Sequence, residues 1–205
     1  SLDAACRVGP FIRHVHCLPI QNGRHVAHVL TCDEGMMTTS TERSDIGFRP
    51  ATCSDGAALW ALVRATATLE LNSVYFYLLF ATDFGDHCLI AESGGETVGA
   101  VVGYRPPRDP SAAFVWQIGV SPAMQGRGLG LRMLKAWRNL PANRDADCIT
   151  ATVATDNTAS DRLFRALARD LGTSVEVREH FTSDMFPAPH PPEPLYRIGP
   201  LSREG

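Results

Sequence analysis

Residues 114–133 read FVWQIGVSPAMQGRGLGLRM, and this stretch decides the fold. An apolar run over residues 114–120 predicts a strand, and an amphipathic segment over residues 129–140 predicts a helix. Between them lies a loop with three glycines, Gly126, Gly128 and Gly130. Glycines let the backbone approach a ligand closely, and the first N–H groups of a helix have no intrahelical partner. The stretch therefore predicts an anion site, usually one for phosphate, at the start of the helix.

Neither of the two common phosphate-loop patterns fits this loop. No lysine follows a suitable glycine as GxxxxGK[ST] requires, and the glycines run G-R-G-L-G rather than GxGxxG. The loop reads QGRGLG over residues 125–130, which has the spacing Q/R-x-x-G-x-G/A. That spacing resembles the pyrophosphate loop of the GNAT family of N-acetyltransferases, which bind acetyl-CoA. The alternative is a glycine-rich turn that binds nothing.

Composition and charge narrow the class of protein. The chain has 205 residues, 44% of them hydrophobic, and a formal net charge of -3. These values suit one globular domain that acts on small molecules, and they argue against nucleic acid as a partner. No run of 18 apolar residues predicts a membrane span. The six cysteines form no CxxC pair, so we expect reduced thiols and a cytoplasmic protein.

Residues 1–45 show neither helical nor strand periodicity, and we expect a disordered extension ahead of an acetyltransferase domain over residues 46–203. The extension holds four of the seven histidines and three of the six cysteines. A metal-binding module there is the alternative. No pair of these residues has zinc-finger spacing, so we expect no metal.

The rest of the chain predicts an alternation of strands and helices. The predicted strands are 46–51, 88–92, 97–104, 114–120, 147–153, 174–178 and 195–198, with a hairpin turn at Gly94 and Gly95 and an irregular segment over 179–194. Predicted helices follow an N-cap at Ser54 or Asp55, cover 74–82 and 129–140, and run from Asn157 to a stop at Gly172. This order gives an α/β (α+β) chain with a mostly antiparallel sheet and one central parallel crossover. It resembles the GNAT fold, in which the two central strands splay apart.

The resemblance implies a set of cofactor contacts. The strand before the loop would contact the pantetheine arm of acetyl-CoA through Ile118, Gly119 and Val120. The pyrophosphate cradle would be Gln125, Gly126, Arg127, Gly128, Leu129 and Gly130. Asn157 matches an asparagine of the family's T-x-x-N-x-x-A-x-x-L-F/Y pattern and would also bind CoA, or would only cap its helix. Many members have a tyrosine acid where this chain has Phe164, which cannot donate a proton, and Tyr75 and Tyr77 are possible replacements.

Three further blocks narrow the resemblance. They are TLELNSVYFY at residues 68–77, FVWQIGV at residues 114–120, and HPPE at residues 190–193 ahead of LYRI. Together they resemble the L-2,4-diaminobutyrate acetyltransferases of ectoine biosynthesis, a group within the GNAT family. The resemblance implies transfer of acetyl to the γ-amine of L-2,4-diaminobutyrate by a homodimer in a bacterial cytoplasm.

A diamine substrate with a carboxylate needs anionic groups that hold an ammonium. Glu70 would hold or, through a water, deprotonate the attacking amine, with Glu92 in reserve as the base. Glu193, aided by His190, would clamp the other end of the substrate. Trp116 would form an apolar wall beside the acetyl group, with Tyr75 as its polar neighbour. The plainer alternatives are a solvated carboxylate, an exposed loop histidine and a core tryptophan.

Two other functions remain open from the sequence. One is acetylation of a different small polyamine or amino acid. The other is an acyl-CoA-binding module without turnover, which the loss of the tyrosine acid at Phe164 permits.

Overall fold

The computed structural model describes residues 45–66 and 69–202. Apart from residue 45, the predicted extension lies outside the described residues, as does its alternative reading as a metal-binding module. The boundary between extension and domain therefore stays a prediction.

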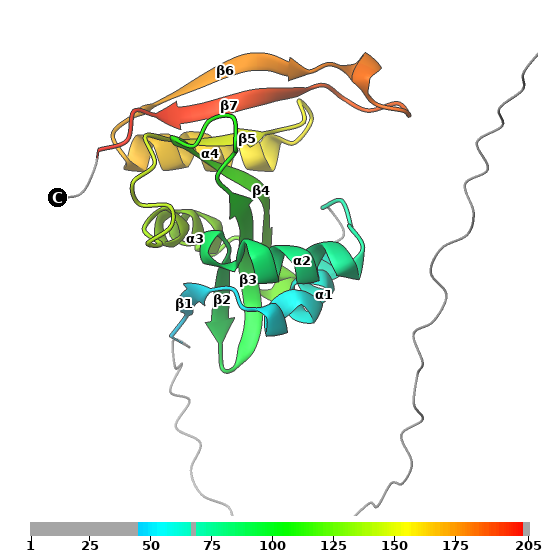
Figure 1. Ribbon diagram of the computed structural model, residues 1–205, viewed down its shortest axis with the longest axis vertical. Helices are drawn as coiled ribbons and strands as arrows, with labels where there is room; N and C mark the ends of the chain where they lie inside the picture. Colours follow the sequence, from blue (N-terminus) through cyan, green and yellow to red (C-terminus); the bar gives the residue numbers. More distant parts are fainter. Residues whose placement is uncertain (1–44, 67–68, 203–205) are drawn as a thin grey trace, which may run out of the picture. The chain divides into compact units, whose positions relative to one another are not determined.

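The described chain forms one seven-stranded sheet with helices on both faces (Figure 1). The strands lie in the order β1-β2-β3-β4-β5-β7-β6, and every neighbouring pair is antiparallel except β4 and β5. The strands are β1 (Gly47–Pro50), β2 (Leu89–Ser93), β3 (Glu96–Tyr104), β4 (Ala112–Val120), β5 (Cys148–Thr152), β6 (Ser174–Phe181) and β7 (Glu193–Gly199). The helices are α1 (Gly56–Thr66), α2 (Val74–Asp83), α3 (Leu129–Arg138) and α4 (Thr158–Asp170). The predicted α/β class with one parallel crossover is confirmed.

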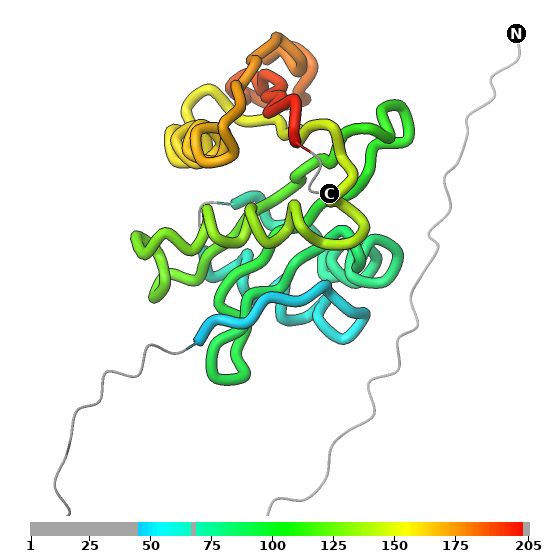
Figure 2. The backbone as a smooth tube through the Cα atoms, turned by 90° about the vertical axis from the view of Figure 1, so that its left-hand side faces the viewer, coloured from blue at the N-terminus to red at the C-terminus, as the bar shows by residue number. Residues whose placement is uncertain are grey.

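Two buried clusters hold the helices on the sheet. One joins α1 and α2 to alternate residues of β2 and β3, such as Ile90 and Ala100. The helices α3 and α4 lie on the opposite face of the sheet (Figure 2). The second cluster joins them to it through residues such as Leu89 and Val101. Neighbouring residues of a strand point to opposite faces, so strands that are covered on both sides read as continuous apolar runs.

The sheet opens between its two central strands. β4 and β5 pair only at Ala112 with Cys148, Ala113 with Ile149, and Phe114 with Thr150. Beyond this point β4 continues to Val120 without β5 beside it. The gap divides the sheet into a half that holds β1 to β4 and a half that holds β5 to β7 (Figure 1).

A bulge interrupts β4 at the gap. Val102 of β3 lies opposite Gln117, but the next residue, Gly103, lies opposite Val115, so Trp116 is the extra residue. A bulge turns side chains out of their regular alternation and is common beside active sites. Here Val115 joins the core under α3, whereas the side chain of Gln117 turns to Tyr77 of α2.

Several predicted boundaries were wrong. The helical region begins before the predicted N-cap at Ser54 or Asp55, because a 3-10 turn over Cys53–Asp55 leads directly into α1. Thr52 caps this turn, and its backbone N–H donates to the Asp55 carboxylate at 2.7 Å in a capping box. β6 continues to Phe181, and Phe181 pairs with Glu193 at the start of β7. The pattern did not predict this extension because β6 is an edge strand whose residues are mostly exposed on both faces.

Both ends of α4 agree with the sequence, whereas the end of α3 does not. Asn157 caps α4 by accepting a hydrogen bond from the Ser160 backbone N–H at 3.0 Å. Gly172 follows the last turn of α4 with a φ of 65°, which a glycine adopts without strain. α3 ends at Arg138 rather than at Leu140.

Candidate active site

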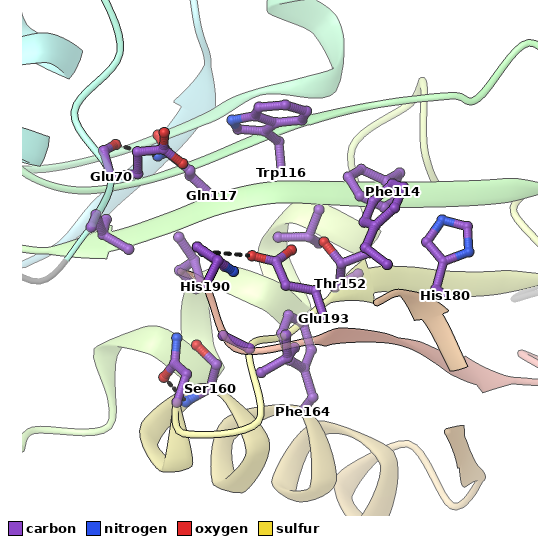
Figure 3. A pocket seen from close by; sticks show the side chains of 18 of the residues that line it. Glu70, Phe114, Trp116, Gln117, Thr152, Ser160, Phe164, His180, His190 and Glu193 are labelled. Atoms are coloured by element: carbon purple, nitrogen blue, oxygen red, sulfur yellow. Dashed lines mark hydrogen bonds and ion pairs between the residues drawn. The ribbon is translucent and has the colours of Figure 1, made fainter. Parts of the chain in front are cut away.

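A cavity of about 490 Å³ lies where β4 and β5 part. One wall is β4 from Phe114 to Ile118, and the other is the end of β5 with the start of α4 (Figure 3). The hairpin of β6 and β7 contributes side chains that include His190 and Glu193. The cavity thus draws its residues from both halves of the sheet.

The loop before α3 has the geometry of an anion site. Gly126 and Gly128 have φ values of 73° and 72°, a left-handed backbone that favours glycine. Gln125 ties the loop to the strand end, because its Nε2 donates to the Val120 carbonyl at 3.3 Å. Residues 125–128 are exposed, while Leu129 is buried and anchors the helix. The N–H groups of the first turn are therefore open to a pyrophosphate.

The remaining predicted cofactor residues lie on β4, at the cavity wall and at the start of α3. Ile118 and Asn157 line the cavity, and Gly119 and Val120 continue β4 towards the loop. Gly130 packs α3 on α4, since a Cβ there would lie 3.5 Å from Leu163. The residues fit an extended phosphate-bearing ligand that enters between the splayed strands, although their individual contacts stay predictions.

The histidine and glutamate of the hairpin form a pair on one wall. His190 Nδ1 lies 2.6 Å from the Pro191 carbonyl, and a carbonyl can only accept, so the proton resides on Nδ1. Nε2, the other ring nitrogen, lies 3.7 Å from Glu193 Oε1. Phe186 stacks on the imidazole with ring centroids 4.0 Å apart, which fixes the ring plane.

Glu70 and Trp116 come from the other half of the sheet. Both line the cavity, and Trp116 is 46% exposed because the bulge turns it out of the core. Its ring lies 5.6 Å from that of Phe76 on α2. The structure therefore brings four of the five predicted substrate residues to one cavity (Glu70, Trp116, His190 and Glu193).

Three tyrosine and glutamate candidates lie elsewhere. Tyr75 projects from α2, is 72% exposed and does not line the cavity, so its role stays a prediction. Tyr77 is fully buried and its hydroxyl donates to Gln117 Oε1 at 3.0 Å, so it is not available as an acid. Glu92 accepts from Arg49 at 2.6 Å on the first two strands and is not placed to act as the reserve base.

Sequence reasoning missed several polar residues of the cavity wall. Tyr104, Thr152 and Ser160 bring hydroxyl groups to it, and Phe164 is buried beside them. Burial raises the pKa of Tyr104, so the phenol keeps its proton and can donate. Gln117 was also missed, although a lone amide in the apolar run FVWQIGV is itself a signal of a buried hydrogen bond.

The described residues hold no group of three or more histidine, cysteine, aspartate or glutamate side chains that could bind a metal ion. Among them there is also no helix long and apolar enough to cross a membrane.

Comparisons with known proteins agree with this geometry. Residues 57–168 match the acetyltransferase (GNAT) family. The chain is 40% identical over 151 residues to an L-2,4-diaminobutyric acid acetyltransferase of Shouchella clausii, which covers 73% of this chain and 84% of the relative. It is 41% identical over 155 residues to one of Streptomyces coelicolor, covering 74% of this chain and 91% of that one.

A solved structure is also similar. It is the diaminobutyrate acetyltransferase EctA from Paenibacillus lautus in complex with L-2,4-diaminobutyric acid and coenzyme A. Its TM-score is 0.74 at 35% identity, over 79% of this chain and 99% of that one. This chain belongs to the GNAT family of acetyltransferases and, within it, to the group of L-2,4-diaminobutyric acid acetyltransferases.

Proposed function

We propose that this enzyme transfers the acetyl group of acetyl-CoA to the γ-amine of L-2,4-diaminobutyrate. One observation carries the proposal. A single cavity brings together two carboxylates and an imidazole that suit a diamine, and β4, which lines it, leads on to the glycine loop before α3 that suits a pyrophosphate. Acetyl-CoA is the acetyl donor and supplies a thioester that an amine can attack. The homologous acetyltransferases, one of them bound to both ligands, support the same acceptor.

The hairpin pair suits an ammonium group. In the neutral tautomer with its proton on Nδ1, the Nε2 atom of His190 offers a lone pair next to Glu193 Oε1. Two acceptors that are 3.7 Å apart repel each other slightly and gain from a donor placed between them. The α-ammonium of diaminobutyrate is such a donor. Held there, the substrate directs its other amine towards β4.

Glu70 supplies the base on the opposite wall. An amine with a pKa near ~10 is neutral in only about one molecule in a thousand at pH 7, so catalysis needs a proton acceptor. Glu70 lines the cavity and takes this proton, directly or through a water. The amine nitrogen then bonds to the thioester carbon, the carbon–sulfur bond breaks, and the thiolate leaves with the bonding pair.

The departing thiolate gains its proton from a hydroxyl other than that of the usual tyrosine. Phe164 holds that position in α4 and has no proton to give. Ser160 and Thr152 lie on the same wall, and the neutral phenol of Tyr104 lies on β3. The proposal therefore places the acid among these three groups.

The proposal also covers the pathway, the cellular compartment and the oligomeric state of the enzyme. The reaction would serve the synthesis of ectoine, a compatible solute, under osmotic stress in the cytoplasm. The buried cysteines Cys88 and Cys148 are free thiols, which suits a reducing compartment. A homodimer is supported by the exposed apolar side chains of α2, such as Leu78 and Leu79. Light scattering of the purified protein tests the homodimer.

Thiol release from acetyl-CoA tests the reaction. We expect kcat/KM to be highest for diaminobutyrate and lower for ornithine and lysine. NMR of the product should place the acetyl group on the γ-nitrogen. A higher kcat/KM for ornithine or lysine would instead favour another small amine as the substrate, and acetylation at the α-nitrogen would reverse the proposed orientation.

A further inference from the structure

A buried amide connects the cavity wall to the segment that carries the proposed base. Gln117 is 9% exposed, and its Nε2 donates to the backbone carbonyl of Glu70 at 2.7 Å (Figure 3). Its Oε1 accepts from the Tyr77 hydroxyl at 3.0 Å, and Tyr77 is fully buried. Both ends of one amide are therefore satisfied, one by the backbone of Glu70 within residues 69–73 and the other by Tyr77 of α2.

The bulge in β4 makes this bridge possible. In a regular strand Gln117 would point the same way as Val115, into the core under α3. The extra residue, Trp116, turns Gln117 to the face of α1 and α2 instead. The same bulge thus turns Trp116 out of the core and anchors the backbone of Glu70.

The other contacts of this segment involve Leu69 and Ser73. Glu70 and Leu71 are exposed, whereas Leu69 packs against the cluster of α1 and α2 and approaches Gly119 of β4, where a Cβ would lie 3.4 Å from it. Ser73 caps α2 by accepting from the Phe76 N–H at 3.2 Å. Glu70 itself has no regular secondary structure to fix its carboxylate. The hydrogen bond to its carbonyl therefore restrains the backbone from which that carboxylate projects.

We propose that Gln117, held by Tyr77, is a positioning residue that sets the distance between the Glu70 carboxylate and the amine of the substrate. This inference rests on the proposed function, because it needs Glu70 to touch the substrate. Gln117 does so without contact with the reacting atoms, through the backbone of residue 70. Tyr77 contributes by holding the Gln117 amide in the orientation that donates to Glu70.

The test compares two buried amides. Gln117→Met keeps the shape of the side chain and removes both hydrogen bonds, and Tyr77→Phe removes only the bond to Gln117. Asn143→Leu is the matched control, since Asn143 is 1% exposed, bridges His87 and the Trp137 carbonyl, and does not line the cavity. All three variants should lose thermal stability.

Kinetics separate positioning from stability. We expect Gln117→Met to raise the KM for diaminobutyrate about tenfold and to change the KM for acetyl-CoA less than about twofold. Tyr77→Phe should have a smaller effect of the same kind, and Asn143→Leu should leave both values near those of the wild type. In a Glu70→Gln background, Gln117→Met should add less than about twofold, because the residue acts through Glu70. Fully additive effects would overturn the inference.

Hydrogen exchange gives a readout that needs no substrate. Amides of residues 69–73 should exchange faster in Gln117→Met than in the wild type, and at the wild-type rate in Asn143→Leu. Unchanged exchange in Gln117→Met would refute the positioning role even if the reaction is as proposed. A wild-type protein that does not acetylate diaminobutyrate would refute the proposed function instead, and leave the exchange result standing on its own.

Discussion

Asp55 joins the first strand to the first helix, and its negative charge should make the stability of the fold depend on pH. Its carboxylate accepts two hydrogen bonds from Arg49, both at 2.8 Å, and one from the Thr52 N–H at 2.7 Å. The side chain is 8% exposed, whereas that of Arg49 is 36% exposed. These hydrogen bonds, led by those from the guanidinium, lower the pKa of Asp55 from 3.8 to about 2.

The shift converts into a stability that depends on pH. At 1.36 kcal/mol per pH unit, the lowered pKa corresponds to roughly 2 kcal/mol, and solvent around Arg49 reduces this to about 1.5 kcal/mol. The folded pKa lies below the unfolded value, so the contribution is full above about pH 4. It is lost as pH falls from about 4 to about 2, because the unfolded carboxyl then gains its proton first.

Asp55→Asn tests this account through urea unfolding at several pH values. We expect the variant to lose about 1.5 kcal/mol of unfolding free energy at pH 7, and the difference from the wild type to shrink as the pH falls below 4. Glu176→Gln is the control, because Glu176 and Arg178 are both exposed and solvent screens their pair, so the variant should change the unfolding free energy little at any pH. A difference for Asp55→Asn that is the same at pH 7 and pH 3 would show that charge is not the cause.

Three further predictions concern the reaction. Gly128→Ala places a Cβ at a φ of 72°, which costs about 1–2 kcal/mol of strain, and it should raise the KM for acetyl-CoA about tenfold. The control is Gly94→Ala, which is strained alike in a hairpin turn and should not raise this KM. Equal KM values in the two variants would count against a phosphate role for the loop. Glu70→Gln should lower kcat/KM and change its pH profile while Glu92→Gln does not, and an unchanged kcat/KM from pH 6 to 9 would remove Glu70 from the role of base. Phe186→Ala removes the ring that stacks on His190. Measured by thiol release, this variant should raise the KM for diaminobutyrate about threefold and leave the KM for acetyl-CoA unchanged. An unchanged KM for diaminobutyrate would mean that the stack does not orient the imidazole.

The fold could be predicted because its signals are local. The glycine spacing after residue 120 and the apolar periodicity of each segment determine strand, loop and helix without distant partners. The extent of β6 could not be predicted in this way, since an edge strand exposed on both faces has no alternation to detect. The N-cap at Thr52 was missed for a different reason. Its partner Asp55 belongs to a 3-10 turn ahead of α1, so the cap lies earlier in the chain than the start of the α-helix indicates.

The site was predictable only in part. The cofactor loop follows from glycines and their spacing, but the substrate residues came from the resemblance to a family. The bulge at Trp116 depends on the register between β3 and β4, which no single segment encodes. The buried bond between Tyr77 and Gln117 spans 40 positions of the chain, so it could not be read from residues near either one.

The short junction between β4 and β5 leaves a place where a bound ligand can stabilise the fold. The two strands share three residue pairs, and the rest of β4 has no strand partner on that side, where Val115 to Ile118 line the cavity. A ligand with amide groups that lies there completes the sheet and binds only the folded chain. At a concentration 100 times its Kd, such a ligand adds about 2.7 kcal/mol to the unfolding free energy. The melting temperature of this enzyme should therefore rise with the supply of its own acetyl donor.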